Sequence, residues 1–391
     1  MFGKSSSYLG IDIGAGGIKL VELHQQKKRP VLFTYAFTEA PVDVHMIAAR
    51  SELGVEEMAE KKPTMPLATG QTSEQNKTLT NADEAMEDPN RIERYVAMLK
   101  ALCKKARTHS KIAVASLPVS GVFHAIVTLP ILQKKEETDR VLKAEVQKLL
   151  PFRLEDVVLD SQALPNPSPD QKTERVLVNA VPRAVVLFYT TIFKQAGLIL
   201  DSLEPESIAL ARSLVGRDAA PTMLIDIGAE RTNFFIIEQG IPLTHTSIEL
   251  GGSTVNDILA KRLGVEVPLA QQIKKDLFLR FIKSPAGDTL NRERFFEIFN
   301  PFVAPIIKEI DYTLEMYMRQ NQTERPEKII LSGGASFFPY LSDSIAEIFK
   351  LKCYLGDPWG RVVYQDGLKP ILRTIAPRLS VAIGLALRNM V

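Results

Sequence analysis

The sequence predicts an α/β protein made of two related halves, and three observations carry this prediction. The pentapeptide Ile-Asp-Ile-Gly-Ala occurs at residues 11–15 and again at 225–229. Each copy closes a strand-like run and is followed by two more runs of the same kind. A third glycine turn, Ser332-Gly333-Gly334, follows an apolar run late in the chain and precedes a helical segment. Identity at the start of two matching strand patterns favours duplication of one unit over chance.

The composition is that of a globular protein with more than one core. The chain has 391 residues, of which 45% are hydrophobic and 24% charged, which favours two or more soluble domains. Its net charge of +2 gives no basic field for nucleic acid. Cys103 and Cys353 have no Cys/His cluster near them, which excludes zinc-site spacing and a disulfide framework and suits a reducing cytosol. We therefore expect a cytoplasmic protein, since no segment resembles a signal peptide or a membrane-spanning helix.

The first half opens with three short runs that predict a β-meander, at Tyr8–Ile13, Ile18–His24 and Val31–Phe37. Residues 41–90 lack steady periodicity and, over 60–90, the apolar residues needed for order, so they predict a mobile surface insertion. A helix at Arg91–Arg107 and a buried strand at Lys111–Leu117 follow.

Residues 119–200 predict a small α/β subdomain inserted in the first half. Its expected elements are strands at Phe123–Leu129, Val157–Ala163 and Val176–Pro182, and helices at Lys134–Leu150 and Ala184–Gln195. A helix at Pro205–Val215 and a hinge at Asp218–Pro221 then close the first half.

The second half repeats the opening pattern and adds helices. The expected elements are strands at Met223–Ile227, Asn233–Glu238, Leu243–Glu249 and Lys328–Leu331, helices at Thr254–Leu263, Tyr340–Phe349 and Arg378–Asn389, and a mostly helical stretch over residues 265–320.

The repeated turns have the chemistry of phosphate-binding loops. Glycine lets the backbone bend tightly and brings N–H groups close to a ligand. The first turn, Gly14-Ala15-Gly16-Gly17, is almost bare of side chains. The second, Gly228-Ala229-Glu230-Arg231-Thr232, is bulkier and offers the Thr232 hydroxyl. The sequence therefore predicts two unequal phosphate loops.

Asp12 and Asp226 occupy equivalent positions, two residues before the first glycine of each turn. Mg²⁺ on a nucleotide keeps most of its waters and is commonly held by one or two carboxylates. Capping of a β-turn is the more common role of a single Asp at such a position, but the matched pair favours a metal held through water. Lys19, on the next strand, is a phosphate contact only if the resemblance described next holds, since a lone strand lysine is ordinarily solvated.

These motifs, in this order, resemble the superfamily of actin, Hsp70 and the sugar kinases. The resemblance implies a two-lobed actin-like ATPase fold of duplicated ribonuclease-H-like domains, with ATP and Mg²⁺ held between the lobes. It also implies individual roles: Asp12, Gly14 to Gly17 and Lys19 in the first phosphate loop; Asp226, Gly228 and Thr232 in the second; Gly251 and Gly252 beside the phosphates; Gln271 and Lys274 at the ribose; Gly333, Gly334 and Ala335 at the adenosine; and Glu204 positioning the hydrolytic water.

Within the superfamily the chain is most similar to the PilM family of type IV pilus assembly, and more distantly to FtsA. The most specific stretches are 115–123, 148–160, 225–232 and 355–359. The resemblance implies a first lobe at 1–118 and 201–218, an inserted SHS2-type subdomain at 119–200, a second lobe at 219–264 and 321–391, and a helical subdomain at 265–320.

This resemblance implies an ATP-binding scaffold at the inner face of the cytoplasmic membrane. The recruiting partner would be the N-terminal cytoplasmic peptide of a PilN-type inner-membrane protein; pilus motor ATPases and self-association are further partners that it implies. The strand Phe123–Leu129 and the helix face of Val141, Leu142 and Val146 are consistent with a peptide groove and equally with a core. Glu230 and Arg231 replace the glycines of fast ATPases, which favours binding over turnover.

Two alternatives stay open. An FtsA-like filament protein would need a basic amphipathic helix at its end, whereas this sequence stops at Val391, directly after an expected structural helix. A small-molecule kinase would need a catalytic base in the inserted subdomain, where Asp139, Glu155, Asp156 and Asp160 have no distinctive spacing.

Overall fold

The structure, a computed structural model, describes residues 7–39, 89–164, 172–283, 292–321 and 325–390. The insertion predicted at 41–90 thus lies almost entirely outside the described residues. Within these ranges the chain forms two compact units. The first is built from residues 7–39, 102–116 and 206–390, and the second from 89–101 and 117–205, with the gaps just given.

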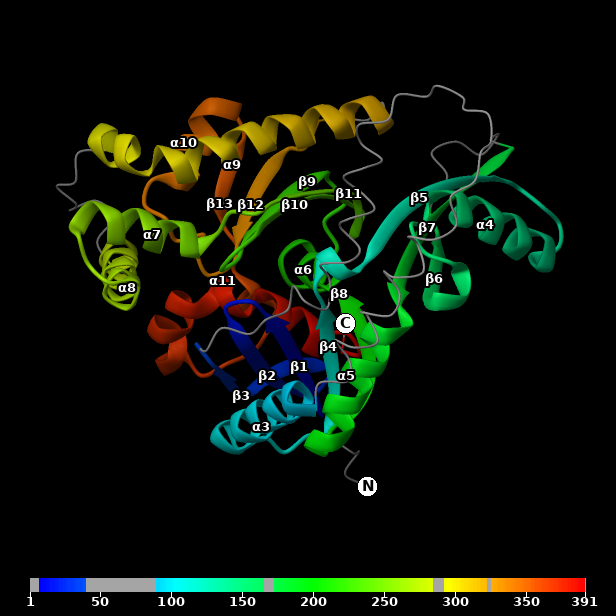
Figure 1. Ribbon diagram of the computed structural model, residues 1–391, viewed down its shortest axis with the longest axis horizontal. Helices are drawn as coiled ribbons and strands as arrows, with labels where there is room; N and C mark the ends of the chain where they lie inside the picture. The colour runs from blue at the N-terminus through cyan, green and yellow to red at the C-terminus, as the bar shows by residue number, and fades with distance from the viewer. Residues whose placement is uncertain (1–6, 40–88, 165–171, 284–291, 322–324, 391) are drawn as a thin grey trace, which may run out of the picture. The chain divides into compact units, whose positions relative to one another are not determined.

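The first unit contains the predicted meander, drawn in blue in Figure 1. Its strands are β1 (Ser7–Gly14), β2 (Gly17–Gln26) and β3 (Arg29–Phe37), and the chain returns through helix α3 (Pro89–Ala106) to β4 (Ile112–Leu117). The strands lie in the order β3-β2-β1-β4, with β1 antiparallel to β2 and parallel to β4. Buried Leu9, Ile11 and Ile13 on β1 place this strand at the centre of the fold.

A second sheet in the same unit repeats this topology. It consists of β9 (Thr222–Ile227), β10 (Thr232–Glu238), β11 (Ile241–Ile248), β12 (Lys328–Ser332) and β13 (Lys352–Leu355). Its order is β11-β10-β9-β12-β13, with β9 antiparallel to β10 and parallel to β12. The strand that carries Asp226 therefore has the same neighbours, in the same directions, as the strand that carries Asp12. The predicted duplication is confirmed.

Helices of the first unit pack on these sheets and on one another. They are α6 (Glu206–Leu210), which continues as a π-helical turn at Ala211–Val215, α7 (Gly252–Leu263), α8 (Val267–Lys283), α9 (Arg292–Asn321), α10 (Leu341–Phe349) and α11 (Lys369–Ala386). Helix α11 packs against β1, β2 and α6. A Cβ added to Gly384 would lie 1.9 Å from the Ala209 oxygen, so only glycine allows this crossing.

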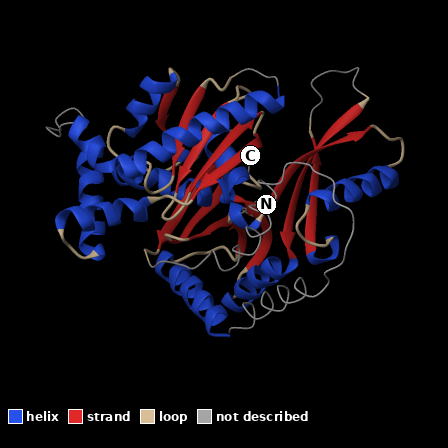
Figure 2. Cartoon of the chain, turned by 45° about the horizontal axis from the view of Figure 1, so that its top comes forward, coloured by secondary structure: helices blue, strands red, loops and turns tan. Residues whose placement is uncertain are grey.

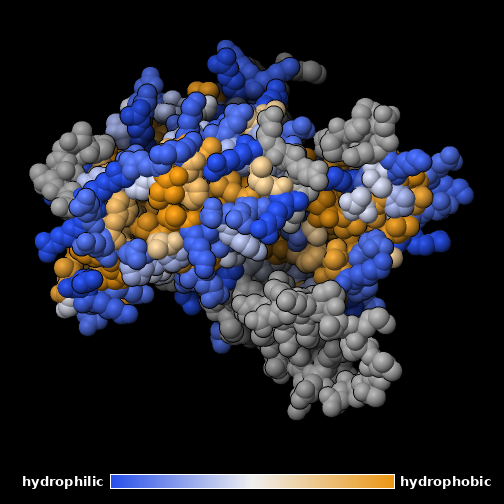
Figure 3. Space-filling view, turned by 90° about the horizontal axis from the view of Figure 1, so that it is seen from above, coloured by the Kyte–Doolittle hydropathy of each residue, from blue (hydrophilic) through white to orange (hydrophobic). Residues whose placement is uncertain are grey.

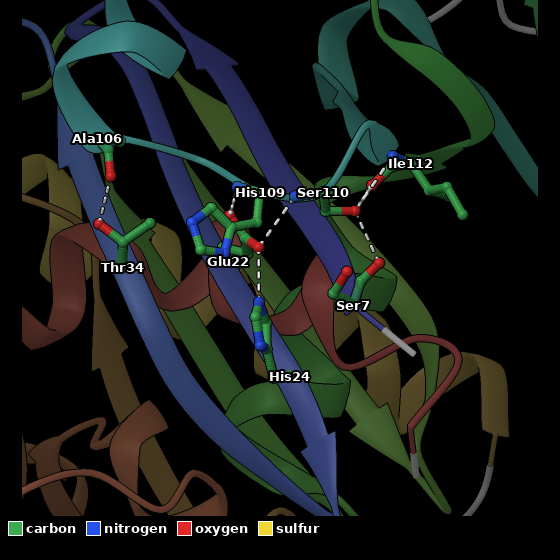
Figure 4. Close-up of polar contacts among 8 residues, drawn as sticks. All are labelled: Ser7, Glu22, His24, Thr34, Ala106, His109, Ser110 and Ile112. Atoms are coloured by element: carbon green, nitrogen blue, oxygen red, sulfur yellow. Dashed lines mark hydrogen bonds and ion pairs between the residues drawn. The ribbon is translucent and has the colours of Figure 1, made fainter. Parts of the chain in front are cut away.

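A buried carboxylate fixes β2 against the loop between α3 and β4 (Figure 4). Glu22 is fully buried, and its oxygens accept hydrogen bonds from the backbone N–H groups of His109 (2.9 Å) and Ser110 (3.0 Å). The His24 ring nitrogen Nε2 lies 2.7 Å from the same carboxylate. A buried carboxylate is stable only when its oxygens are satisfied in this way. The cluster therefore anchors the strand that carries Lys19.

The second unit is a three-stranded antiparallel sheet with helices, visible at the right of Figure 2. Strands β5 (Phe123–Pro130), β6 (Val157–Ala163) and β7 (Thr173–Pro182) lie in the order β5-β7-β6, followed by α5 (Arg183–Ala196) and β8 (Ile199–Pro205). Helix α4 (Lys135–Leu149) packs on β5, and Val127, Leu129, Leu142 and Val146 are buried in one core. These four residues are therefore core residues, as one of the two interpretations predicts, and a peptide groove along the rest of this face stays a prediction.

None of the helices within the described ranges combines the length and the apolar character needed to cross a bilayer.

Candidate functional site

The end of β1 carries a buried ion pair. Asp12 lies directly opposite Lys19 in the β1–β2 register, and the Lys19 Nζ is 2.9 Å from Asp12 Oδ2. The other carboxylate oxygen, Oδ1, accepts a hydrogen bond from the Ser116 hydroxyl (3.0 Å), which itself accepts one from the Ile13 N–H (3.1 Å). Asp12 is only 3% exposed. Its direction is thus fixed by three strands, a rigidity that suits a ligand-binding carboxylate.

The first glycine turn is crowded by its own surroundings. Gly17 has φ +118°, and a Cβ there would lie 2.4 Å from the Thr38 oxygen. A Cβ on Gly14 would lie 2.9 Å from the Lys19 Nζ, and one on Gly16 would lie 3.1 Å from the Ala229 Cβ. The last distance brings the first turn into contact with the second. The two copies of the pentapeptide therefore end at a common place.

The second turn is closed by its own backbone. The Gly228 N–H donates to the Arg231 oxygen (2.9 Å), and the Thr232 hydroxyl donates to the Leu250 oxygen (2.6 Å). The Thr232 hydroxyl, which the sequence predicts as a donor to a phosphate, thus donates its hydrogen to a backbone oxygen of the protein. The Arg231 guanidinium points back to Ser247 and Glu249 on and after β11. Backbone groups, more than side chains, remain for a ligand at this turn.

The Asp226 carboxyl has a raised pKa of about 6. Desolvation by the packed strand ends is the main cause, and the negative charge of Asp12 adds to it. A hydrogen bond from Ser332 and the positive charge of Lys19 act in the opposite direction. The charge of Asp12 is therefore close enough to contribute to the raised pKa of Asp226.

The glycine pair at the start of α7 packs on the second turn. The Gly252 N–H donates to the Gly228 oxygen (2.9 Å), and a Cβ on Gly251 would lie 2.6 Å from the Ala229 oxygen. From α8, the Lys274 Nζ donates to the Gly252 oxygen (2.6 Å). Burial lowers the pKa of Lys274 to about 8, helped by the positive charges of Arg378 and Lys275. This lysine is thus placed at the turn by a direct contact.

The third glycine turn lies against the end of β9. Gly333 has φ +88°, and a Cβ there would lie 2.2 Å from the Ile227 oxygen, which also accepts from the Ala335 N–H (3.1 Å). A Cβ on Gly252 would lie 3.3 Å from the Ala335 Cβ. The turns at residues 14–17, 228–232, 251–252 and 333–335 thus form one continuous cluster with Asp12, Lys19, Asp226 and Lys274.

Two predicted residues fall outside these contacts. Gln271 lies on α8, about one turn before Lys274, and is half-buried. Glu204 belongs to the second unit, near the end of β8, and is buried. Their proposed roles at the ribose and at a hydrolytic water stay predictions.

The residues of this cluster fit a magnesium-bound nucleotide. Bare backbone at three glycine turns allows phosphate oxygens to approach N–H groups. Across the described residues, no group of three or more His, Cys, Asp or Glu side chains could hold a metal alone. Two carboxylates are nevertheless sufficient for Mg²⁺, which retains waters and phosphate oxygens as its other ligands.

The second unit contains a separate pocket of about 290 Å³. Strands β6, β7 and β8 and helix α5 contribute most of its lining: Leu117, Val158, Asp160, Asn179, Val181, Val186, Thr190, Leu200, Ser202, Leu203 and Pro205. The lining is mainly apolar, with Asp160 and Asn179 paired across β6 and β7. On the face of the molecule drawn in Figure 3, apolar side chains reach the surface in patches among charged ones. No motif or periodicity in the sequence predicts this pocket.

Comparison with known proteins gives a family and a fold. The sequence profile of the family described as Type IV pilus assembly protein PilM matches residues 74–390. The structure described as PilM-PilN type IV pilus biogenesis complex superposes with a TM-score of 0.73 at 22% identity, covering 98% of both chains. The ethanolamine utilization protein EutJ from Carboxydothermus hydrogenoformans superposes with a TM-score of 0.51 at 16% identity, covering 98% of this chain and 90% of EutJ. At these identities the two structures establish the actin-like fold.

Proposed function

Because this chain belongs to the PilM family of type IV pilus assembly proteins, we propose that it is an ATP-binding scaffold whose nucleotide state controls its affinity for a membrane partner. The partner would be the short cytoplasmic N-terminal segment of a PilN-type inner-membrane protein, which would hold the scaffold at the inner face of the membrane. The contact between the two repeated glycine turns is the single observation that carries the nucleotide part of this proposal.

The chemistry of the cluster supports a nucleoside triphosphate with Mg²⁺. Backbone N–H groups of residues 14–17 and 228–232 would bind phosphate oxygens, and Lys19 would add a positive charge. Asp12 and Asp226 would orient the waters of the metal, whose charge would neutralise the phosphates. Gly333 and Ala335 would lie against the adenosine, with Lys274 nearby. The second turn keeps its Thr232 hydroxyl engaged with Leu250, which favours slow hydrolysis.

The pocket of the second unit supports the partner part of the proposal. Its apolar lining suits two or three aliphatic side chains of an extended segment. The His124 ring nitrogen Nδ1 lies 2.9 Å from the Asn179 Oδ1, so a contact from β5 orients the side chain of this pocket residue. The Asp160 carboxylate beside it accepts hydrogen bonds. We therefore place the partner segment here, in preference to the β5–α4 face that the core occupies.

A titration with a ten-residue peptide from the N-terminus of a PilN-type protein tests this part. We expect dissociation constants in the micromolar range for the wild type. Val158→Glu places a charge in the pocket and should abolish binding, because the desolvated carboxylate would have no partner. Leu187→Glu, at an exposed position next to the pocket-lining Val186, is the matched control and should bind normally. Equal peptide affinity in both variants would rule out the pocket.

The coupling between the two ligands is tested by repeating the peptide titration with ATP and Mg²⁺. Any change in peptide affinity must appear as the same factor in the affinity for ATP, because linkage is reciprocal. A factor of about five or more is expected for a switch. Identical peptide affinities at saturating ATP and without ATP would reduce the proposal to a scaffold without nucleotide control.

A further inference from the structure

The segment that leaves β3 touches the nucleotide cluster at two places. We call residues 37–39 the strap: Phe37 is the last residue of β3, and Thr38 and Glu39 follow it directly. The Thr38 N–H donates to the Ile18 oxygen (2.8 Å), and its hydroxyl accepts from the Ile18 N–H (2.9 Å). Because Ile18 follows Gly17, the strap is bonded to the first phosphate loop.

Glu39, the last residue of the strap, forms ion pairs with two basic side chains that lie far away in the sequence. Glu39 Oε2 is 2.6 Å from the Lys275 Nζ on α8, and Glu39 Oε1 is 3.2 Å from the Arg378 Nη1 on α11. The Arg378 guanidinium also lies 4.8 Å from the centre of the Phe37 ring. The two cations hold the pKa of Glu39 below its ordinary value, with the Lys275 hydrogen bond as the largest cause. The carboxylate is therefore ionised in both contacts at neutral pH.

Both cations lie beside the part of the cluster assigned to the adenosine. The Arg378 Nε is 3.8 Å from the position of a Cβ on Gly334. Lys275 is the neighbour of Lys274, whose Nζ bonds the Gly252 oxygen. Glu39 thus joins the strap, which Thr38 bonds to the first phosphate loop, to α8 and α11.

We propose that Glu39 is a positioning residue for the nucleotide, which holds α8 and α11 against the first phosphate loop and slows nucleotide release. This inference rests on the proposed nucleotide binding. Glu39 need not touch the nucleotide itself. It acts through Lys275 and Arg378, so that release requires two ion pairs to break together.

The experiment measures the dissociation rate of mant-ADP with Mg²⁺ by stopped-flow chase with unlabelled ADP. Glu39→Gln keeps the shape of the side chain and removes its charge. The pairs are partly exposed, so we expect dissociation to become about three- to tenfold faster, with little change in the association rate. The matched control is Glu347→Gln, which breaks the paired contact with Arg292 between α9 and α10 and should leave the rate unchanged.

Two further readouts separate positioning from loss of folded protein. At about 1 M salt the ion pairs are screened, so the wild type should approach the rate of Glu39→Gln. Lys275→Met should speed release on its own, but should add little in the Glu39→Gln background. If the effects of the two substitutions on the dissociation rate are additive, or if wild type and Glu39→Gln still differ in rate at high salt, the ion pairs of Glu39 do not control nucleotide release.

The outcome for the wild type distinguishes this inference from the function on which it rests. If the wild type binds no mant-ADP or mant-ATP, the proposed nucleotide binding fails. If the wild type binds and Glu39→Gln releases nucleotide at the same rate, nucleotide binding stands and the positioning role of Glu39 is refuted.

Discussion

Replacing Asp226 with asparagine removes a carboxylate that the folded protein ionises with difficulty. Its pKa is raised from 3.8 to about 6, chiefly by desolvation. The folded state therefore binds the proton more tightly than the unfolded state, and ionisation lowers the free energy of unfolding as the pH rises between these two values. Above pH 6 the penalty is complete and constant. Asparagine resembles the protonated acid and carries no such penalty.

The shift corresponds to about 3 kcal/mol at neutral pH. Because Asp226 is partly exposed, we expect a gain between about 1 and 3 kcal/mol for Asp226→Asn at pH 7 and above. About half of that gain should be present at pH 5, and little near pH 4. Urea unfolding without nucleotide, in EDTA, at pH 5, 6, 7 and 8 measures this difference.

The control for this experiment is Asp311→Asn, which removes the same charge from an exposed position on α9 and should show no such profile. A gain for Asp226→Asn that does not change with pH, or a loss at pH 8, would refute the desolvation of the carboxylate. The same variant should lose Mg²⁺-dependent nucleotide binding, so that stability and binding change in opposite directions.

Two other expectations concern the cluster, and a third concerns Glu204. Gly333→Ala should destabilise the protein by roughly 2 kcal/mol or more and abolish nucleotide binding, because its Cβ would lie 2.2 Å from a backbone oxygen. Gly360→Ala, whose Cβ would have nothing within 4 Å, is the control. It should change neither the stability measured by thermal unfolding nor the affinity measured by nucleotide titration. Nucleotide affinity should fall as the pH rises from 7 to 9, because Lys274, with a pKa of about 8, loses its charge there. If the affinity of Lys274→Met does not change over this pH range, Lys274 is the group responsible. If the affinity of the variant falls as steeply as that of the wild type, Lys274 is excluded. Glu204→Ala should lower ATP turnover in a phosphate-release assay and leave nucleotide affinity largely intact; equal loss of both would contradict a role at the hydrolytic water.

The strands of both halves could be predicted because their side chains are buried on regular patterns. The runs at 8–13 and 223–227 consist of apolar residues next to a glycine turn, and the structure extends each by only one or two residues. Two strands were missed. β8 (ILDSLEP) mixes acidic and apolar residues, and β13 (KCYL) has only four residues. Neither has the periodicity on which a sequence-based assignment depends.

The last helix began earlier than predicted. It starts at Lys369 rather than Arg378, with Pro370 in its first turn and Pro377 inside it. Proline suits the first turn, where no N–H bond is lost, but an interior proline usually ends a helix. The sequence therefore favoured a start after Pro377. Packing of the helix on β1 and β2 outweighs that local cost.

The cluster of glycine turns was accessible to sequence reasoning because a repeat marks it twice. The side-chain contacts that complete this cluster could not be predicted from the sequence. The Thr232 hydroxyl is engaged by Leu250, and Lys19 is held by Asp12, and both facts depend on side-chain geometry. The pocket of the second unit gave no sequence signal either, because its lining comes from four strands and a helix spread over residues 117–205.

The central claim is that the two repeated turns form one nucleotide site. Its most direct test is the binding of mant-ATP with Mg²⁺ to the wild type and to Asp12→Ala, monitored by fluorescence titration. Asp12→Ala should fold, since Lys19 remains partly exposed and can reach solvent, but should bind at least tenfold more weakly. Wild-type protein that binds no nucleotide, or Asp12→Ala protein that binds equally well, would contradict the account.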